Sequence, residues 1–198
     1  EGDLAKKILA ENNKHFQKIL IMPNLNIPIT NSKLLNKYRK HLLKNNKNLE
    51  ILFTIYLNQN CSIRELSEMK KKKLFFSVKL YPQNATTNSS SGVSDIKKMT
   101  KFFEFLEKNE VPLCVHGEHV QLNDDPFERE KKFLDIELHW IRKNFPNLKI
   151  TLEHITTKDS VDFVKQHNLI GATVTTHHLL ENTYTFFGNH LSPELFCK

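Results

Sequence analysis

Cysteine is scarce in this chain of 198 residues, and none of its three cysteines belongs to a Cys-x-x-Cys pair. Cys61, Cys114 and Cys197 are odd in number and widely spaced, and Cys114 lies in an apolar run where a reduced thiol packs well. The pattern favours a reducing compartment over a disulfide framework. We therefore expect a cytoplasmic protein.

Long apolar runs are also missing. No run approaches the roughly 18 residues that a membrane span needs, and the residues from Glu1 to Leu4 contain no basic region followed by an apolar one. We expect a soluble protein that does not enter a membrane.

Nucleotide-binding signatures are absent, because the chain has neither a Gly-x-Gly-x-x-Gly pattern nor a P-loop lysine. The net charge of +7 is compatible with nucleic acid, an anionic small substrate or a lysine-rich surface. The densest basic cluster, Lys70 to Lys73, follows a helical pattern, where cations complement the helix dipole. A lysine-rich surface is favoured, and we expect no nucleic-acid partner.

Short β-branched or aromatic runs alternate with longer segments of helical period along the whole chain. The expected strands cover residues 19–22, 51–57, 74–80, 113–116, 149–154 and 170–175. The expected helices begin near Ser32, Ser62, Ser94 or Asp95, Pro126 and Asp159. With 39% hydrophobic residues, the chain can bury a core.

This alternation predicts an α/β fold in which helices cover a parallel sheet, either doubly wound or part of a (β/α)8 barrel. The missing nucleotide motifs favour the barrel. Neither an internal repeat nor a long linker divides the chain, so residues 1–198 are expected to form one partial barrel domain of about six βα units.

Four polar residues stand where predicted strands end: Asn24, Lys79, His116 and His154. Barrel enzymes place their reacting groups at these ends. Two neutral imidazoles on neighbouring strands can bind zinc, and an unprotonated lysine can react with carbon dioxide to give a carbamate that bridges two metals. The alternative is that each histidine is a separately hydrogen-bonded core group and that Lys79 pairs with Glu118 or Glu153.

The chain resembles a known family through several segments: Met22-Pro23-Asn24-Leu25, Lys79-Leu80-Tyr81-Pro82, Asn84 to Ser90, Val115-His116-Gly117-Glu118 and Glu153 to Asp159. These segments resemble, in the same order, those of the shorter, bacterial-type dihydroorotases of the amidohydrolase superfamily, and the resemblance extends from about Gly2 to Cys197. The fold of that family is a metal-dependent hydrolase barrel. The resemblance implies a zinc-dependent cyclic amide hydrolase that interconverts N-carbamoyl-L-aspartate and L-dihydroorotate in pyrimidine biosynthesis.

The resemblance also implies residue roles. Lys79 would be the carbamylated lysine that bridges two zinc ions, and His116 and His154 would bind the second of them. Asn24 would bind the substrate carboxylate, and Thr86 with Thr87 would belong to a mobile loop that closes over the ring. Composition alone favours an ordinary flexible surface loop, and without the resemblance Asn24 is equally a turn residue after Pro23.

Two elements of the family pattern are missing. A His-x-His-x-Arg segment is expected just before Glu1, and an aspartate that acts as zinc ligand and general base is expected beyond Lys198. The chain thus resembles roughly the second to seventh barrel units. One zinc or none is expected in it, and His177 and His178, as residues of a loop, are expected to be exposed or hydrogen-bonded rather than substitute ligands.

Other functions stay open at this stage. The chain could be a catalytically incomplete fragment or a non-catalytic barrel module that binds at most one zinc, or a related cyclic amidohydrolase. An incomplete barrel exposes sheet edges and apolar surface, so we expect poor stability alone and a homodimer.

Overall fold

A computed structural model describes residues 3–43, 49–182 and 184–185 of the chain. Its six strands form one parallel sheet in sequential order: β1 (Lys18–Ile21), β2 (Glu50–Leu57), β3 (Ser77–Leu80), β4 (Leu113–His116), β5 (Ile150–Glu153) and β6 (Ile170–Ala172). A doubly wound sheet would reverse its strand order at a switch point, and this sheet does not.

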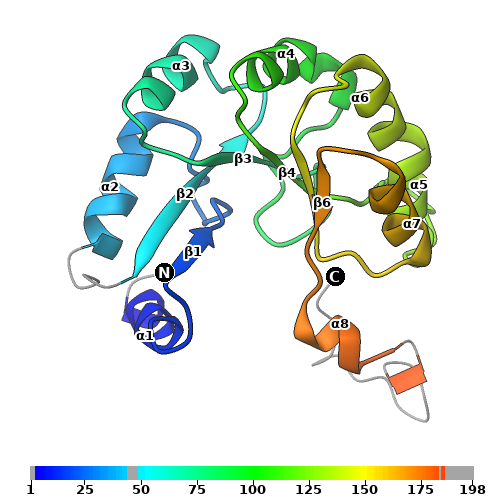
Figure 1. Cartoon of the computed structure of the whole chain (residues 1–198), viewed down its shortest axis with the longest axis horizontal. Coiled ribbons are helices and arrows are strands. Elements are labelled where there is room, and N and C mark those ends of the chain that lie inside the picture. The colour runs from blue at the N-terminus through cyan, green and yellow to red at the C-terminus, as the bar shows by residue number, and fades with distance from the viewer. Residues whose placement is uncertain (1–2, 44–48, 183, 186–198) are drawn as a thin grey trace.

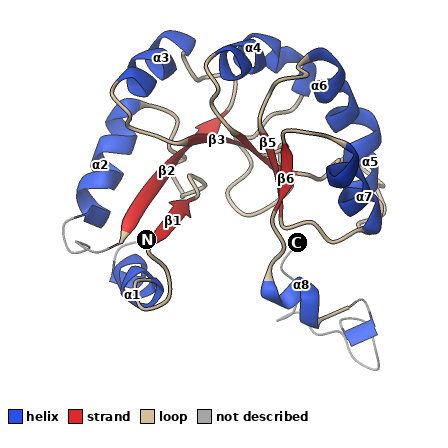
Figure 2. Cartoon of the chain, in the orientation of Figure 1, coloured by secondary structure: helices blue, strands red, loops and turns tan. Residues whose placement is uncertain are grey.

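Helices connect the strands and lie along the convex side of the curved sheet (Figure 1). They are α2 (Ser32–Leu43), α3 (Ile63–Lys71), the 3₁₀ helix η1 (Ile96–Met99), α4 (Thr100–Lys108), α5 (Arg129–Phe133), the π-helix η2 (Leu134–Leu138), α6 (His139–Asn144) and α7 (Lys158–Gln166). Helices α1 (Asp3–Asn12) and α8 (Thr176–Leu180) lie at the two ends of the arc (Figure 2). The fold is an incomplete (β/α) barrel, as the sequence predicted.

The main core lies between the outer face of the sheet and the helices. Leu80, Val115 and Leu152 point outward from β3, β4 and β5 and are fully buried. They belong to one cluster with Phe103 of α4 and Ile141 of α6. Each such side chain contributes about 1.5–3 kcal/mol of burial free energy. Because side chains alternate along a strand, the residues between these apolar ones point to the inner face, and several of them are polar.

Two predicted helix starts are confirmed and a third is wrong. Ser62 caps α3 by accepting from the Glu65 amide at 3.4 Å, and Asp95 caps η1. Ser32 does not cap α2, because Asn31 Oδ1 accepts from the Leu34 amide at 3.0 Å. Ser32 instead donates its hydroxyl to Glu65 at 2.5 Å.

Several predicted strand limits are also corrected. Strand β3 begins at Ser77 rather than residue 74, after a turn in which Lys73 has a φ of 52°. Strand β6 ends at Ala172 rather than residue 175, because Thr176 begins α8. Strand β1 covers residues 18–21 rather than 19–22.

The long helix expected from Pro126 begins later, at Arg129, and is divided by the π-helical turn η2. Pro126 therefore lies in the preceding turn, not in the first helical turn. His177 and His178 belong to helix α8 rather than to a loop. Helix α1 was not predicted.

The cysteines that the structure describes are reduced. Cys61 and Cys114 are free and buried, whereas Cys197 lies outside the described residues. Within the described part of the chain, the helices are too short or too polar to cross a bilayer.

Candidate functional site

The inner face of the sheet is polar near the carboxyl ends of its central strands. The residues concerned alternate along four strands: Thr54 and Tyr56 on β2, Ser77 and Lys79 on β3, Cys114 and His116 on β4, and Thr151 and Glu153 on β5. Several contact one another, as in the 3.2 Å hydrogen bond between the hydroxyls of Thr54 and Ser77. Because the strands are parallel, the second residue of each pair lies toward the carboxyl end of the sheet, and these ends form one mouth.

His116 and His154 meet at this mouth. His116 ends β4 and His154 follows β5, and the two strands are paired. The Nδ1 atom of His116 lies 3.1 Å from the Nε2 atom of His154. His116 is buried, and its other ring nitrogen, Nε2, lies 2.5 Å from Oε2 of Glu118.

The backbone at His154 explains how this ring reaches the mouth. Glu153 and His154 are consecutive, yet Glu153 contacts Lys79 and His154 contacts His116. Regular strand alternation would place them on opposite faces. His154 has a φ of 46°, uncommon for a residue other than glycine, and its amide donates to Thr173 Oγ1 at 2.8 Å. The residue that follows β6 therefore holds the strained backbone in place.

Lys79 is almost completely buried, with 1% of its surface exposed. Its ammonium group forms an ion pair and hydrogen bond with Oε2 of Glu153 and lies 4.9 Å from the centre of the Tyr81 ring. The structure thus contains the pairing with Glu153 that the sequence left open. An ammonium group has no lone pair for a metal, so a ligand role for Lys79 requires loss of a proton, which ends its ion pair with Glu153.

Three weak acids around Lys79 stay neutral near pH 7. Burial raises the pKa of Tyr56 to about 12 and that of Cys114 to about 11. Burial also raises the pKa of Tyr81, and the nearby Glu153 carboxylate raises it further. Tyr56 and Tyr81 are stacked with ring centres 5.1 Å apart. These side chains supply neutral polar groups rather than charge.

Asn24 contacts the loop that follows β3. Its Nδ2 atom donates to the carbonyl of Thr87 at 3.3 Å, and Asn88 donates back to the carbonyl of Asn24 at 3.0 Å. The Thr86 amide donates to Ser89 Oγ at 2.8 Å, which closes a turn within the loop. The structure thus places Asn24 against the loop that carries Thr86 and the exposed Thr87. This loop contacts the inner face of the sheet, where the Tyr56 hydroxyl donates to the Asn88 carbonyl at 3.4 Å.

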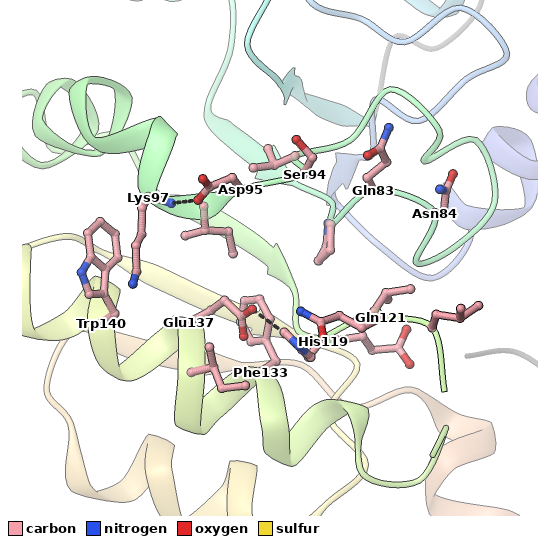
Figure 3. Close-up of a pocket in the computed structure, with 17 residues that line it drawn as sticks. Gln83, Asn84, Ser94, Asp95, Lys97, His119, Gln121, Phe133, Glu137 and Trp140 are labelled. Atoms are coloured by element: carbon pink, nitrogen blue, oxygen red, sulfur yellow. Dashed lines mark hydrogen bonds and ion pairs between the residues drawn. The ribbon is translucent and has the colours of Figure 1, made fainter. Parts of the chain in front are cut away.

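A cavity of about 700 Å³ lies next to the mouth (Figure 3). Phe133, Glu137 and Trp140 line its helical side, and residues of the loops after β3 and β4 line the other. His119 and Glu137 are joined at 2.6 Å within it. Burial raises the pKa of Glu137, against the influence of His119. Glu118 borders the cavity, but Lys79, His116 and His154 do not.

The sequence missed the carboxylates that organise this region. Glu118 and Glu153 were candidate partners of Lys79 and stand in segments that carry the resemblance, but no role at the mouth was predicted for them, and none was predicted for Glu130. Glu130 is buried and accepts hydrogen bonds from the backbone and hydroxyl groups of Thr156 and Thr157 and from the Ser160 hydroxyl. Glu130 is 26 to 30 residues away from these partners, which follow β5, so no local sequence pattern indicates the contact.

The paired histidines fit two positions of a zinc site. Ligand nitrogens about 2.0–2.1 Å from a tetrahedral zinc lie roughly 3.3 Å apart, close to the observed 3.1 Å. Within the described residues, however, His, Cys, Asp and Glu form no cluster of three or more that could hold a metal. His177 and His178 are also adjacent, and Thr175 Oγ1 lies 3.2 Å and 2.7 Å from their rings.

Comparison with known proteins extends over the whole chain. A dihydroorotase from Buchnera aphidicola is 39% identical over 202 residues, which cover 100% of this chain and 58% of that protein. The crystal structure of a dihydroorotase from Campylobacter jejuni has a TM-score of 0.90 and 35% identity, again over 100% of this chain and 58% of the other.

A dihydroorotase from Saccharomyces cerevisiae, solved in complex with 5-fluoroorotic acid, has a TM-score of 0.84 and 28% identity over 94% of this chain and 55% of the other. No protein-family model matches the chain. The chain spans 58% of the length of the curated dihydroorotases from Buchnera and from Agrobacterium fabrum. By sequence and by fold, this chain is related along its whole length to the dihydroorotases.

Proposed function

We propose that this chain contributes the second-zinc side of a dihydroorotase active site. The whole enzyme interconverts N-carbamoyl-L-aspartate and L-dihydroorotate by closing or opening a cyclic amide in pyrimidine biosynthesis. The 3.1 Å approach of His116 Nδ1 and His154 Nε2 at adjacent strand ends carries the proposal. The buried free thiols Cys61 and Cys114 suit a reducing compartment such as the cytoplasm.

In this proposal, His116 Nδ1 and His154 Nε2 would hold one zinc ion. Lys79, at the neighbouring strand end, would join them as a carbamate once its ammonium has lost a proton and its amine has added carbon dioxide with loss of a second proton, which ends the ion pair with Glu153. Zinc, when bound, polarises a carbonyl oxygen and lowers the pKa of water. Tyr56 and Tyr81 remain neutral and add no competing charge beside these ligands.

Asn24, Thr86 and Thr87 bind the substrate in this proposal. Dihydroorotate carries a carboxylate, and the Asn24 amide and the threonine hydroxyls are donors suited to it. The 5-fluoroorotic acid in the yeast relative is a cyclic ligand of the same kind. Opening the loop breaks the bonds between Asn24 and residues 87–88 and the long bond from the Tyr56 hydroxyl to the Asn88 carbonyl, and bonds to substrate can replace them.

A second function is favoured by one observation. In the part of the chain that the structure describes, two histidines converge but no third His, Cys, Asp or Glu completes a metal cluster with them. A barrel module that binds one zinc and catalyses nothing would show this donor set. Such a module requires neither Lys79 carbamylation nor a closing loop.

The two functions differ in catalysis. We would extend this chain with the remaining portion of the Buchnera dihydroorotase and measure ring opening of L-dihydroorotate after zinc loading. Activity is expected in the extended protein, together with a mass increase of one carbon dioxide on Lys79.

Histidine variants test whether ring opening depends on the proposed zinc ligands. His116→Ala and His154→Ala should each abolish ring opening, whereas His15→Ala, at an exposed histidine, should retain it. Zinc binding without ring opening in the extended protein would support the non-catalytic module. Ring opening that survives both histidine substitutions would contradict the proposed site.

A further inference from the structure

We propose that Glu118 is a positioning residue that holds the His116 ring with its proton on Nε2, so that Nδ1 presents a lone pair toward His154. This inference rests on the proposed function, because the lone pair is needed for metal binding. Histidine ligands commonly donate their second ring N–H to a carboxylate, which orients the ring.

The contact between Glu118 and His116 specifies the proton position. Glu118 and His116 are both buried, and Glu118 Oε2 lies 2.5 Å from His116 Nε2. A carboxylate only accepts hydrogen bonds, so Nε2 must carry the hydrogen. In a neutral ring the lone pair then lies on Nδ1, the atom 3.1 Å from His154.

The turn from His116 to Glu118 brings the Glu118 side chain back to the His116 ring. Glu118 follows His116 by two residues, and its amide donates back to the His116 carbonyl at 3.1 Å. At the intervening Gly117, an added Cβ would lie 2.6 Å from Leu152 Cδ1. Glycine therefore lets this turn pack closely against β5 while Glu118 reaches the ring.

A neighbouring pair provides a matched control. His119 Nδ1 lies 2.6 Å from Glu137 Oε1, so this carboxylate also orients an imidazole. The pair lines the cavity next to the mouth, and neither His116 nor His154 lines that cavity. Removing the charge of Glu137 should therefore leave His116 unchanged.

The test is to read the His116 tautomer directly. Metal-free protein labelled with ¹⁵N-histidine would be examined by long-range ¹H–¹⁵N correlation at about pH 8, above the usual histidine pKa of about 6.5. His116→Asn identifies the signals. Wild-type protein, Glu118→Gln and Glu137→Gln would be compared, and the zinc affinity of each measured by competition with a chelator.

We expect wild-type His116 to carry its proton on Nε2. Glu118→Gln should increase the Nδ1–H form severalfold, because the glutamine amide can donate to Nε2, and should weaken zinc binding by about 10- to 100-fold. Glu137→Gln should change neither. An Nδ1–H tautomer in the wild type, or an unchanged tautomer in Glu118→Gln, would overturn the inference.

The two readouts separate this inference from the proposed function. A tautomer change without zinc binding by the wild type would support the role of Glu118 and contradict the metal site. If wild type and Glu118→Gln bind zinc equally well and the tautomer is unchanged, the metal site would be supported and the role of Glu118 contradicted. If Glu118→Gln fails to fold, as judged by circular dichroism, the wild-type tautomer still decides.

Discussion

Residue identity and strand position together indicated the candidate site, but side-chain partners did not follow from them. Lys79, His116 and His154 could be placed at one mouth because parallel strands end at the same edge. The positive φ of His154 has no periodic signature, so its turn toward His116 could not be predicted. Strand position likewise could not decide whether Glu118 or Glu153 pairs with Lys79, because both lie near the same edge of the sheet.

Glu130 is a buried carboxylate that accepts hydrogen bonds from several donors. It lies on α5 and accepts from Thr156, Thr157 and Ser160 at 2.5–3.1 Å, at the start of α7. Glu130→Gln keeps the shape but directs amide hydrogens at donors. We expect a loss of about 3 kcal/mol in unfolding free energy, measured by urea denaturation.

Glu128→Gln is the control for that substitution, because Glu128 is exposed and lies two residues before Glu130, just before α5. Its effect should stay within about 0.5 kcal/mol. Equal denaturation midpoints for the two variants would show that the Glu130 network does not stabilise the fold.

At the scale of elements, existence and order were predictable, whereas boundaries depended on local backbone. The alternation of apolar runs and helical periods located all six strands. It could not show that the Lys73 turn shortens β3 or that a π-helical turn divides the helix after Pro126. Helix α1 was missed, although Leu9 packs into the core.

The loop after β3 should depend on Gly92. An added Cβ there would lie 2.5 Å from the Tyr81 carbonyl and 2.8 Å from the Ser89 carbonyl, and backbone atoms cannot move aside easily. Gly92→Ala should cost about 1–3 kcal/mol in unfolding free energy and disturb the loop that holds Thr86 and Thr87. Calorimetric unfolding would measure the loss.

Gly171→Ala is the matched substitution in open space, because no atom lies within 4 Å of the added Cβ. Its effect should stay within about 0.5 kcal/mol. A loss as large as that of Gly92→Ala would mean that close packing at Gly92 is not the cause.

At the scale of the whole molecule, the open sheet exposes apolar surface. Strand β1 lies at one edge, beside a cleft of about 530 Å³ that Ile8, Phe16 and Ile19 help to line. Ile8 and Phe16 are exposed by 52% and 56%. Unpaired edges with apolar neighbours favour association.

We therefore expect the chain to self-associate, and Ile8→Glu with Phe16→Glu to reduce association by placing charge in the cleft. Sedimentation velocity over a range of protein concentrations would measure it. Leu122→Glu, at a residue exposed by 94% and remote in sequence from the cleft, is the control. A wild-type chain that sediments as a monomer throughout would contradict the expected homodimer.

The central claim is that His116 and His154 hold zinc at the mouth of the incomplete barrel. The most direct measurement is the zinc content of the purified chain after loading and dialysis, for the wild type, the His116→Ala/His154→Ala double variant and His15→Ala. The account predicts about one zinc per chain in the wild type and in His15→Ala, and none in the double variant. Equal zinc content in all three, or no zinc in the wild type, would contradict it.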